Sequence, residues 1–152
     1  ARNIFRICVS DPTAQVKING VLTTLPLINN FYYEIPAIDQ PQLIESDLAI
    51  TVAQYTTTQN TCGNGVPGDP EVIYLSSVEQ NIKTVLFNSN LLVNSPNAPN
   101  QPHQHWVNAI IPNGGTALSS FRIDGNAPFV SFNVHPQDPN YSYIQIPSLA
   151  LG

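Results

Sequence analysis

Charged residues are scarce in this chain, and this scarcity is the first constraint on what it does. Asp, Glu, Lys and Arg make up 10% of its 152 residues, with five Lys and Arg against ten Asp and Glu. Globular domains usually contain about 25% of these four residue types. Five basic side chains and a net charge of −5 cannot form a basic patch. We therefore exclude nucleic acid and anionic membrane surfaces as partners.

The chain also lacks methionine and any apolar run of about 20 residues, the length that crosses a bilayer. We expect no membrane insertion, and we expect Ala1 to follow a removed signal peptide, an upstream region or an artificial boundary. The two cysteines, Cys8 and Cys62, are too few for a disulfide framework. In an oxidising compartment they form a candidate disulfide. The alternative is a buried free Cys8 and an unrelated loop Cys62.

Uncharged polarity and proline take the place of charge. Asn, Gln, Ser and Thr must carry the solubility of the chain, and 14 Pro make its turns rigid. This composition suits extracellular β proteins, in which hydrogen-bonding surfaces and rigid turns matter more than charge. We therefore place the chain outside the cell or at the cell surface.

Short alternating runs broken by Pro, Gly and Asn predict an all-β fold with almost no helix. The expected strands are residues 4–9, 14–19, 31–35, 49–55, 71–75, 83–87, 106–111, 119–124, 129–134 and 141–146. An antiparallel β-sandwich of two stacked sheets suits many short strands that have no helices to cover them. A small propeller-like or barrel arrangement is the alternative.

Two pairs of segments indicate an internal repeat. Val-Lys-Ile-Asn-Gly at residues 16–20 matches Phe-Arg-Ile-Asp-Gly at 121–125, and Tyr-Tyr-Glu-Ile-Pro at 32–36 matches Tyr-Ile-Gln-Ile-Pro at 143–147. Asn-Gly and Asp-Gly are strong hairpin signals. We predict one β domain over residues 1–152, with a complete first repeat over about 1–87, a connector over about 88–104 and a partial second repeat over about 105–152.

The stretch from Ser46 to Gln80 contains a candidate binding corner. An alternating strand ends there in Gln54, whose amide must find hydrogen bonds on a buried face. A long polar loop follows and closes with Asp69 and Glu71. We predict that Gln54, Asp69 and Glu71 contact a ligand. The alternative is a structural turn, in which Asp69 accepts backbone hydrogen bonds.

Tyr32 and Tyr143 occupy matching positions in the two repeats and complete the set of candidate ligand-binding residues. Alternation sends Phe31, Tyr33 and Ile35 to one face of a strand and Tyr32 to the other. An exposed tyrosine ring there can stack on a sugar or on a protein partner. Packing between neighbouring strands is the alternative.

Metal and catalytic chemistry have little support. His103 and His105 have a metal-ligand spacing, but no third ligand can be identified. Asp69 and Glu71 lack the dense alternating carboxylates of a calcium loop. No Ser, Cys or carboxylate pair stands in a recognisable nucleophile or acid–base setting. We therefore predict no metal, no cofactor and no enzymatic activity.

Five motifs, taken in their order and spacing, carry a family resemblance. They are Ser46-Asp47 with Ile50, Val52 and Gln54-Tyr55; Gly68-Asp69-Pro70-Glu71; Glu79-Gln80; Trp106-Val107-Asn108; and Ile123-Asp124-Gly125. Together they resemble the IgGFc-binding-protein N-terminal domain family, from about Asn3 to the end of the chain. The resemblance implies a secreted, all-β, non-enzymatic module used in adhesion, in mucus or matrix assembly, or in ligand binding.

We therefore predict an extracellular, non-enzymatic structural or adhesive module of a larger secreted or cell-surface protein, including a filament-forming one. A discrete glycan- or protein-binding module is the alternative. Either role implies a protein or glycan partner at a cell surface or in a matrix. The partial second repeat would leave an incomplete sheet edge, through which the module could self-assemble.

Overall fold

The structure, a computed structural model, describes residues 3–56, 71–86, 94–95, 98–99 and 106–147. These residues are nearly all in antiparallel strands or in the turns that join them, which confirms the all-β prediction. The chain divides into two compact units, Ala1–Lys83 and Thr84–Gly152. No helix among the described residues is long and apolar enough to cross a membrane.

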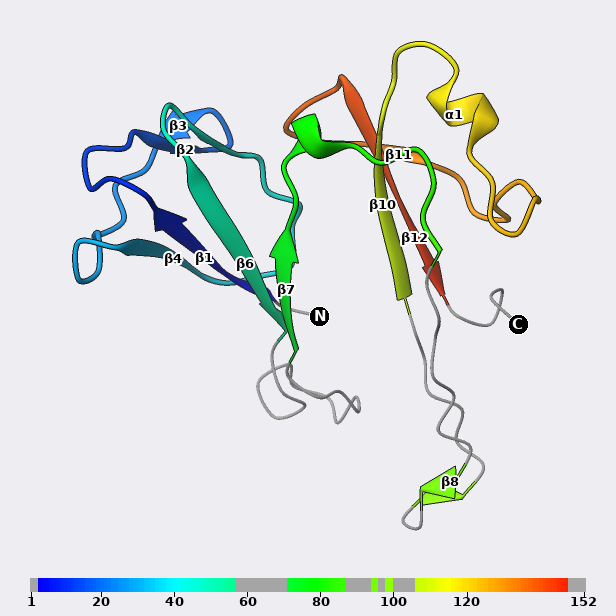
Figure 1. The fold of residues 1–152 in the computed structure, drawn as a ribbon, viewed down its shortest axis with the longest axis horizontal. Helices are drawn as coiled ribbons and strands as arrows, with labels where there is room; N and C mark the ends of the chain where they lie inside the picture. The colour runs from blue at the N-terminus through cyan, green and yellow to red at the C-terminus, as the bar shows by residue number, and fades with distance from the viewer. Residues whose placement is uncertain (1–2, 57–70, 87–93, 96–97, 100–105, 148–152) are drawn as a thin grey trace. The chain divides into compact units, whose positions relative to one another are not determined.

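The first unit is organised around a four-stranded antiparallel sheet in the order β4-β1-β6-β7 (Figure 1). Its strands are β1 (Asn3–Val9), β4 (Tyr32–Ile38), β6 (Ile50–Thr56) and β7 (Val72–Leu75). Successive side chains of a strand point to opposite faces. In β1 this alternation buries Phe5, Ile7 and Val9 on the inner face and leaves Arg6 and Cys8 on the outer face.

A smaller sheet, in the order β3-β2-β5, packs against the inner face of the four-stranded sheet. Its strands are β2 (Val16–Ile18), β3 (Val21–Leu22) and β5 (Ile44–Ser46). The shared core consists of Phe5, Ile7, Val9, Ala14, Val16 and Ile35. Ile7 is completely buried at its centre. Two antiparallel sheets enclosing one core make this unit a small β-sandwich.

The Asn-Gly signal produces the predicted hairpin between β2 and β3. Asn19 and Gly20 have φ values of 54° and 79°, the left-handed pair that a tight two-residue hairpin turn requires. Asn19 also joins the hairpin to the segment before β5. Its Oδ1 accepts from the Leu43 N–H at 2.9 Å, and its Nδ2 donates to Gln42 Oε1 at 2.9 Å.

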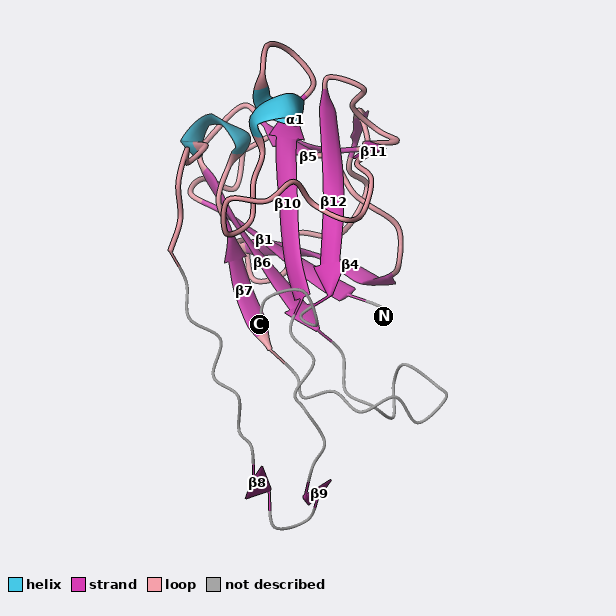
Figure 2. Cartoon of the chain, turned by 90° about the vertical axis from the view of Figure 1, so that its right-hand side faces the viewer, coloured by secondary structure: helices cyan, strands magenta, loops and turns pink. Residues whose placement is uncertain are grey.

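The second unit contains a three-stranded antiparallel sheet in the order β10-β12-β11. Its strands are β10 (Trp106–Pro112), β11 (Asn133–Val134) and β12 (Tyr141–Pro147). Figure 2 shows the two long strands, β10 and β12, side by side. Ile144 and Ile146 of β12 are almost completely buried. A two-stranded ribbon, β8 (Asn94–Ser95) with β9 (Ala98–Pro99), precedes this sheet in the chain.

Three predicted strands are wrong or too long. Residues 83–86 form no strand, and residue 87 lies outside the described residues. The predicted strand at 119–124 is replaced by a single helical turn, α1 (Ala117–Ser120), followed by one isolated bridge at Ile123. Ala and Leu at its start favour helix over strand. The strand predicted at 129–134 is reduced to β11. A second short helix, η1 (Val78–Gln80), follows β7.

The internal repeat is not confirmed. Asp124 and Gly125 do repeat the left-handed turn of the first unit, with φ values of 50° and 79°. The strand pairing does not repeat, however. Phe5 lies opposite Ile35 in the first unit, whereas Ile110, which the repeat aligns with Phe5, lies opposite Tyr143. The strands that the repeat aligns thus pair in a different register.

Candidate functional site

A cluster of four side chains occupies the outer face of the four-stranded sheet. The Arg6 Nε donates a hydrogen bond to Glu34 Oε2 at 2.8 Å. The guanidinium carbon of Arg6 lies 5.2 Å from the ring centre of Tyr32 and 5.1 Å from that of Tyr55. Both distances are within the range of a cation–π interaction. We call Arg6, Tyr32, Glu34 and Tyr55 the Arg6 cluster.

Strand register brings the Arg6 cluster together. Arg6 lies directly opposite Glu34 on β4, while the two tyrosines lie diagonally on either side of it. Tyr32 is opposite Cys8, and Tyr55 is opposite Ile4. Diagonal neighbours in a sheet are within reach of long and aromatic side chains. Three strands that are distant in sequence thus contribute to one surface.

The guanidinium of Arg6 is fixed in place and still partly open to solvent. The hydrogen bond to Glu34 raises the pKa of Arg6 above its ordinary value, against a smaller opposing effect of burial. Relative exposure is 43% for the Arg6 side chain and 35% for that of Glu34. Within the described residues, Nη1 and Nη2 of Arg6 and Oε1 of Glu34 have no hydrogen-bond partner. Nη1 and Nη2 of Arg6 can therefore donate to a ligand, and Oε1 of Glu34 can accept from it.

A hollow of about 260 Å³ lies beside the cluster, at the end of β1. Its lining residues are Cys8, Val9, Ser10, Phe31, Ala49, Ile50 and Thr51. Cys8 and Thr51 face each other on the outer side of the sheet, and Cys8 also lies opposite Tyr32. The ring of Phe31 packs edge-on against that of Tyr32, with the ring centres 6.4 Å apart. The contact between Phe31 and Tyr32 therefore joins the lining of the hollow to the Arg6 cluster.

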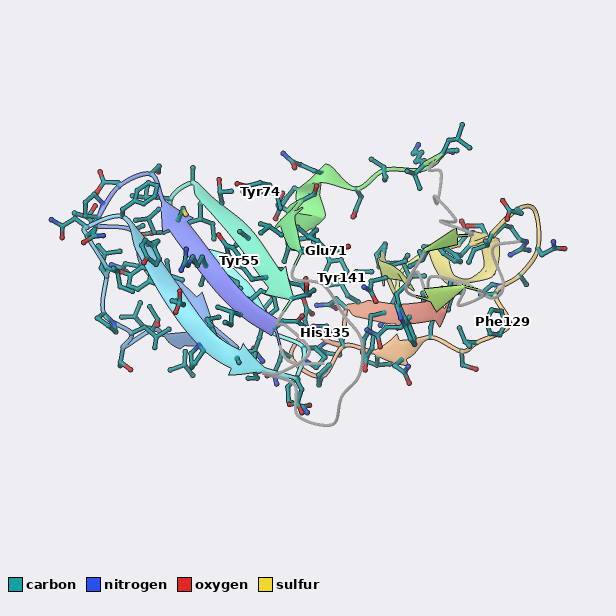
Figure 3. All side chains as sticks on the ribbon, turned by 90° about the horizontal axis from the view of Figure 1, so that it is seen from below. Tyr55, Glu71, Tyr74, Phe129, His135 and Tyr141 are labelled. Atoms are coloured by element: carbon teal, nitrogen blue, oxygen red, sulfur yellow. The ribbon has the colours of Figure 1, made fainter. Side chains whose placement is uncertain are left out.

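The same sheet ends in an exposed apolar edge strand. All four residues of β7 are exposed, from 41% for Leu75 to 74% for Tyr74. Within the described part of the chain, β7 pairs only with β6. Figure 3 labels Tyr74 on this strand and Tyr55 on β6.

Two hydrogen bonds at the start of β7 fix the direction of its backbone groups. The Thr56 N–H donates to the Glu71 carbonyl at 3.0 Å, and the Glu71 N–H donates to Thr56 Oγ1 at 2.7 Å. Glu71 therefore faces β6. Because backbone groups alternate in direction along a strand, those of Val72 and Tyr74 point to the open edge.

Comparison with known proteins assigns the family. A family model described as IgGFc binding protein matches residues 1–151. The chain belongs to this family. Membership in the IgGFc binding protein family indicates an extracellular binding module, and the match confirms the resemblance carried by the sequence motifs. No curated protein and no solved structure matches the chain.

The structure places the predicted ligand residues of this IgGFc-binding-family chain on different parts of the fold, with Tyr32 on the outer face of the four-stranded sheet and Tyr143 in the second unit. Tyr32 is part of the Arg6 cluster on the outer face. Gln54 pairs with Phe5 and therefore points to the inner face, and its side chain has no hydrogen bond within the described residues. Glu71 immediately precedes β7, and Asp69 lies outside the described residues. Gln54 lies opposite Ile73, two residues after Glu71, so Gln54 and Glu71 are diagonal neighbours across β6 and the start of β7. With Asp69 outside the described residues, the predicted binding corner stays a prediction.

Tyr143, the fifth predicted ligand residue, belongs to the second unit. Its ring packs edge-on against that of the buried His135, with the ring centres 6.3 Å apart. This contact supports the packing alternative for Tyr143 and leaves its role in binding a prediction. The imidazole of His135 accepts a hydrogen bond from the Gln137 N–H through Nδ1 at 3.3 Å.

The remaining sequence candidates fall largely on residues that are not described. Cys8 is half-buried and has no disulfide partner among the described residues, and Cys62 lies outside them, so their pairing stays a prediction. His103 and His105 lie outside the described residues as well. Among the described residues, no group of three or more His, Cys, Asp or Glu side chains is placed to hold a metal ion.

Sequence reasoning missed three members of the Arg6 cluster. Alternation in β1 already separates Arg6 from the buried Phe5 and Ile7. The same alternation puts Glu34 on the face of Tyr32. Opposite charges at outward positions of two neighbouring strands are the signal that could have found this pair. Using that signal requires knowing which strands pair and in which register.

Proposed function

We propose that this chain is a non-enzymatic adhesive module of a larger secreted or cell-surface protein, and that it binds a protein partner through the open edge of β7. Membership in the IgGFc binding protein family supports an extracellular binding role. The observation that carries the proposal is the unprotected edge strand. Four consecutive apolar side chains, Val-Ile-Tyr-Leu, are exposed along it.

An open edge of this kind favours the addition of a strand from a partner. Edge strands expose unpaired N–H and C=O groups, and natural proteins usually protect them with charged residues, Pro, bulges or covering segments. No charged residue or Pro interrupts β7. Strand addition would pair the backbone groups of Val72 and Tyr74 that point to the open edge, and the side chains would contact alternate residues of the added strand.

The side chains of β7 are exposed on both faces of the sheet, and a partner strand could contact both sets. Val72 and Tyr74 share the outer face with Tyr55 and Ala53, their partners on β6. Ile73 and Leu75 point to the inner face. A partner strand with apolar residues at alternate positions would therefore extend the sheet on both faces. A second copy of the chain could supply such a strand, and a filament or matrix role would then follow.

Two assays test this proposal, one with immunoglobulin Fc as the protein probe and one for self-association by sedimentation. The variant Tyr74→Pro removes an N–H that points to the open edge and keeps the hydrogen bonds to β6. The variant Tyr74→Lys places a charge on the edge. We expect either change to weaken Fc binding or self-association at least about tenfold, the effect of losing about 1.4 kcal/mol of binding energy.

The matched control is Val134→Lys, which places a lysine on an exposed residue of β11, an edge strand of the three-stranded sheet in the second unit. We expect Val134→Lys to leave both assays unchanged. The proposal is wrong if wild type neither binds Fc nor self-associates, or if the Tyr74 and Val134 variants behave alike.

A further inference from the structure

The Arg6 cluster and its hollow form a second site, distinct from the open edge of β7. We propose that this site binds a neutral pyranose sugar, with the sugar ring in the hollow beside Cys8 and Thr51 and two adjacent hydroxyl groups against Arg6 and Glu34. The inference goes beyond the proposed contact with a protein partner, because it uses the outer face around Arg6 in place of the open edge of β7, and a different ligand chemistry.

The first argument is the match of donors and acceptors. Nη1 and Nη2 of Arg6 carry N–H donors, and Oε1 of Glu34 is an acceptor. All three atoms lack a hydrogen-bond partner within the described residues. A hydroxyl group both donates and accepts, so two adjacent hydroxyls satisfy a guanidinium and a carboxylate that lie side by side. The 2.8 Å hydrogen bond between the two side chains holds them in this arrangement before the ligand arrives.

The second argument is charge. The Arg6–Glu34 pair is neutral as a unit, and the whole chain has a net charge of −5. Glu34 lies directly against the only cation of the cluster, where it repels a carboxylate, sulfate or phosphate that approaches the guanidinium. Arg6 likewise repels a cationic ligand that approaches the carboxylate of Glu34. Neutral ligands are therefore favoured over ligands of either sign.

The third argument is the shape and lining of the surface. Tyr32 and Tyr55 flank the ion pair with rings that combine an apolar body and a polar hydroxyl tip. The hollow of about 260 Å³ is slightly smaller than the ~300 Å³ at which pockets for drug-sized ligands begin. Ser10 and Thr51 add two hydroxyl groups, neither of which has a hydrogen bond within the described residues.

The cluster and the hollow are close enough for one ligand to contact both. Arg6 and Cys8 are two residues apart on the same strand, which corresponds to about 6.8 Å along the sheet. A ligand of one or two sugar rings therefore reaches from Thr51 to Glu34. Aromatic walls with a few polar groups that fix orientation are the usual composition of small-molecule sites.

The test is a titration of the full chain, labelled with ¹⁵N, with neutral methyl glycosides and with the matching disaccharides. Sialyllactose serves as the anionic sugar, and an uncharged extended peptide serves as the alternative ligand. We expect amide shifts in β1, β4 and β6 with a neutral sugar, and weaker or no shifts with the other two ligands.

Two conservative variants locate the site. Arg6→Lys keeps the positive charge and loses the forked donors, so we expect it to weaken neutral-sugar binding at least about tenfold. Glu34→Gln makes the cluster cationic, so we expect it to weaken neutral-sugar binding and to strengthen binding of sialyllactose. A purely structural role of Glu34 would weaken binding of both sugars together.

Two controls complete the experiment. Arg122→Lys changes an arginine of the second unit whose Nη1 donates to the Ser119 and Phe121 carbonyls. Leu22→Ala truncates an exposed side chain of β3 in the smaller sheet of the first unit. Neither variant should alter sugar binding. The inference is overturned if neutral sugars cause no shifts, if sialyllactose or the peptide binds wild type better, or if Arg6→Lys and Arg122→Lys have equal effects. The Fc and self-association assays, read through Tyr74→Pro, report on the β7 edge independently.

Discussion

Arg6 and Glu34 face each other across β1 and β4, joined by a 2.8 Å hydrogen bond between Arg6 Nε and Glu34 Oε2. Arg6 also lies between the rings of Tyr32 and Tyr55. The pair is thus more constrained than two isolated surface charges, although both side chains remain more than a third exposed. Its contribution to stability and its availability to a ligand follow from the same geometry.

The ion pair should stabilise the first unit by a small and measurable amount. A double-mutant cycle with Arg6→Ala, Glu34→Ala and the double variant should give a coupling energy of about 0.2–1 kcal/mol, the range for exposed pairs that solvent screens. Urea unfolding measures it. The coupling should decrease in high salt. A coupling energy of zero at low salt would show that the two side chains do not interact in solution.

Ile7 should be among the positions of the first unit most sensitive to truncation. It is completely buried at the centre of the core. Ile7→Ala should therefore cost about 2–5 kcal/mol, because it removes apolar contacts and leaves a cavity. Leu22→Ala is the matched control: Leu22 is 53% exposed on β3, and its truncation should cost less than about 0.5 kcal/mol. Equal losses in denaturant unfolding would contradict the placement of the core.

Replacing Gly20 by alanine should lower the stability of the protein, and replacing Gly114 by alanine should raise it. Neither glycine has an atom within 4 Å of an added Cβ, so only the backbone differs. Gly20 has a φ of +79°, and alanine there should cost about 1–2 kcal/mol. Gly114 is not in the left-handed region, and alanine there should stabilise by up to about 1 kcal/mol, because it restricts the unfolded chain. Thermal unfolding of the two variants compares them directly, and a Gly20→Ala variant as stable as wild type would count against the Asn-Gly turn.

Acid should weaken the turn that follows β1. The Thr13 N–H and hydroxyl both donate to Asp11 Oδ1, at 2.8 and 2.7 Å, and these bonds lower the pKa of Asp11 below its ordinary 3.8. A lowered pKa means that the stabilisation is complete above the unfolded value and is lost as the pH falls through the folded value. The advantage of wild type over Asp11→Asn in melting temperature should therefore be present at about pH 7 and decrease as the pH falls below 3.8. A gap that persists in acid would contradict this assignment.

The strands with clean alternation were predictable, because their period is local. Residues 4–9 and 141–146 lie completely within β1 and β12, and Asn19-Gly20 marked its hairpin. The helical turn α1 was not predictable, because Ala117–Ser120 are too few residues to show a 3.6-residue period. Local patterns therefore predicted the longer strands. They failed for α1, which is only about as long as one helical period of 3.6 residues.

The candidate site was only partly predictable for a related reason. Alternation fixes the face of Tyr32 from its own segment alone. The meeting of Arg6 and Glu34 depends on the register between β1 and β4, and an irregularity between Asn3 and Phe5 shifts that register. The exposed edge at β7 depends on which strand ends the sheet. Both are properties of pairing between distant segments, and a single strand does not contain them.

The position of β1 in the sheet also has a consequence for folding kinetics. Of the four strands of this sheet, β1 is synthesised first, and it is an interior strand: Asn3 pairs with Ile38 on one side and with Thr56 on the other. The edge of β1 that pairs with β6 stays unpaired until residues 50–56 have been synthesised. Such non-local pairing implies slow folding, on the order of milliseconds to seconds for β-sandwiches. The four-stranded sheet therefore closes late, and a chaperone that shields Phe5 and Ile7 during synthesis should increase the yield of folded protein.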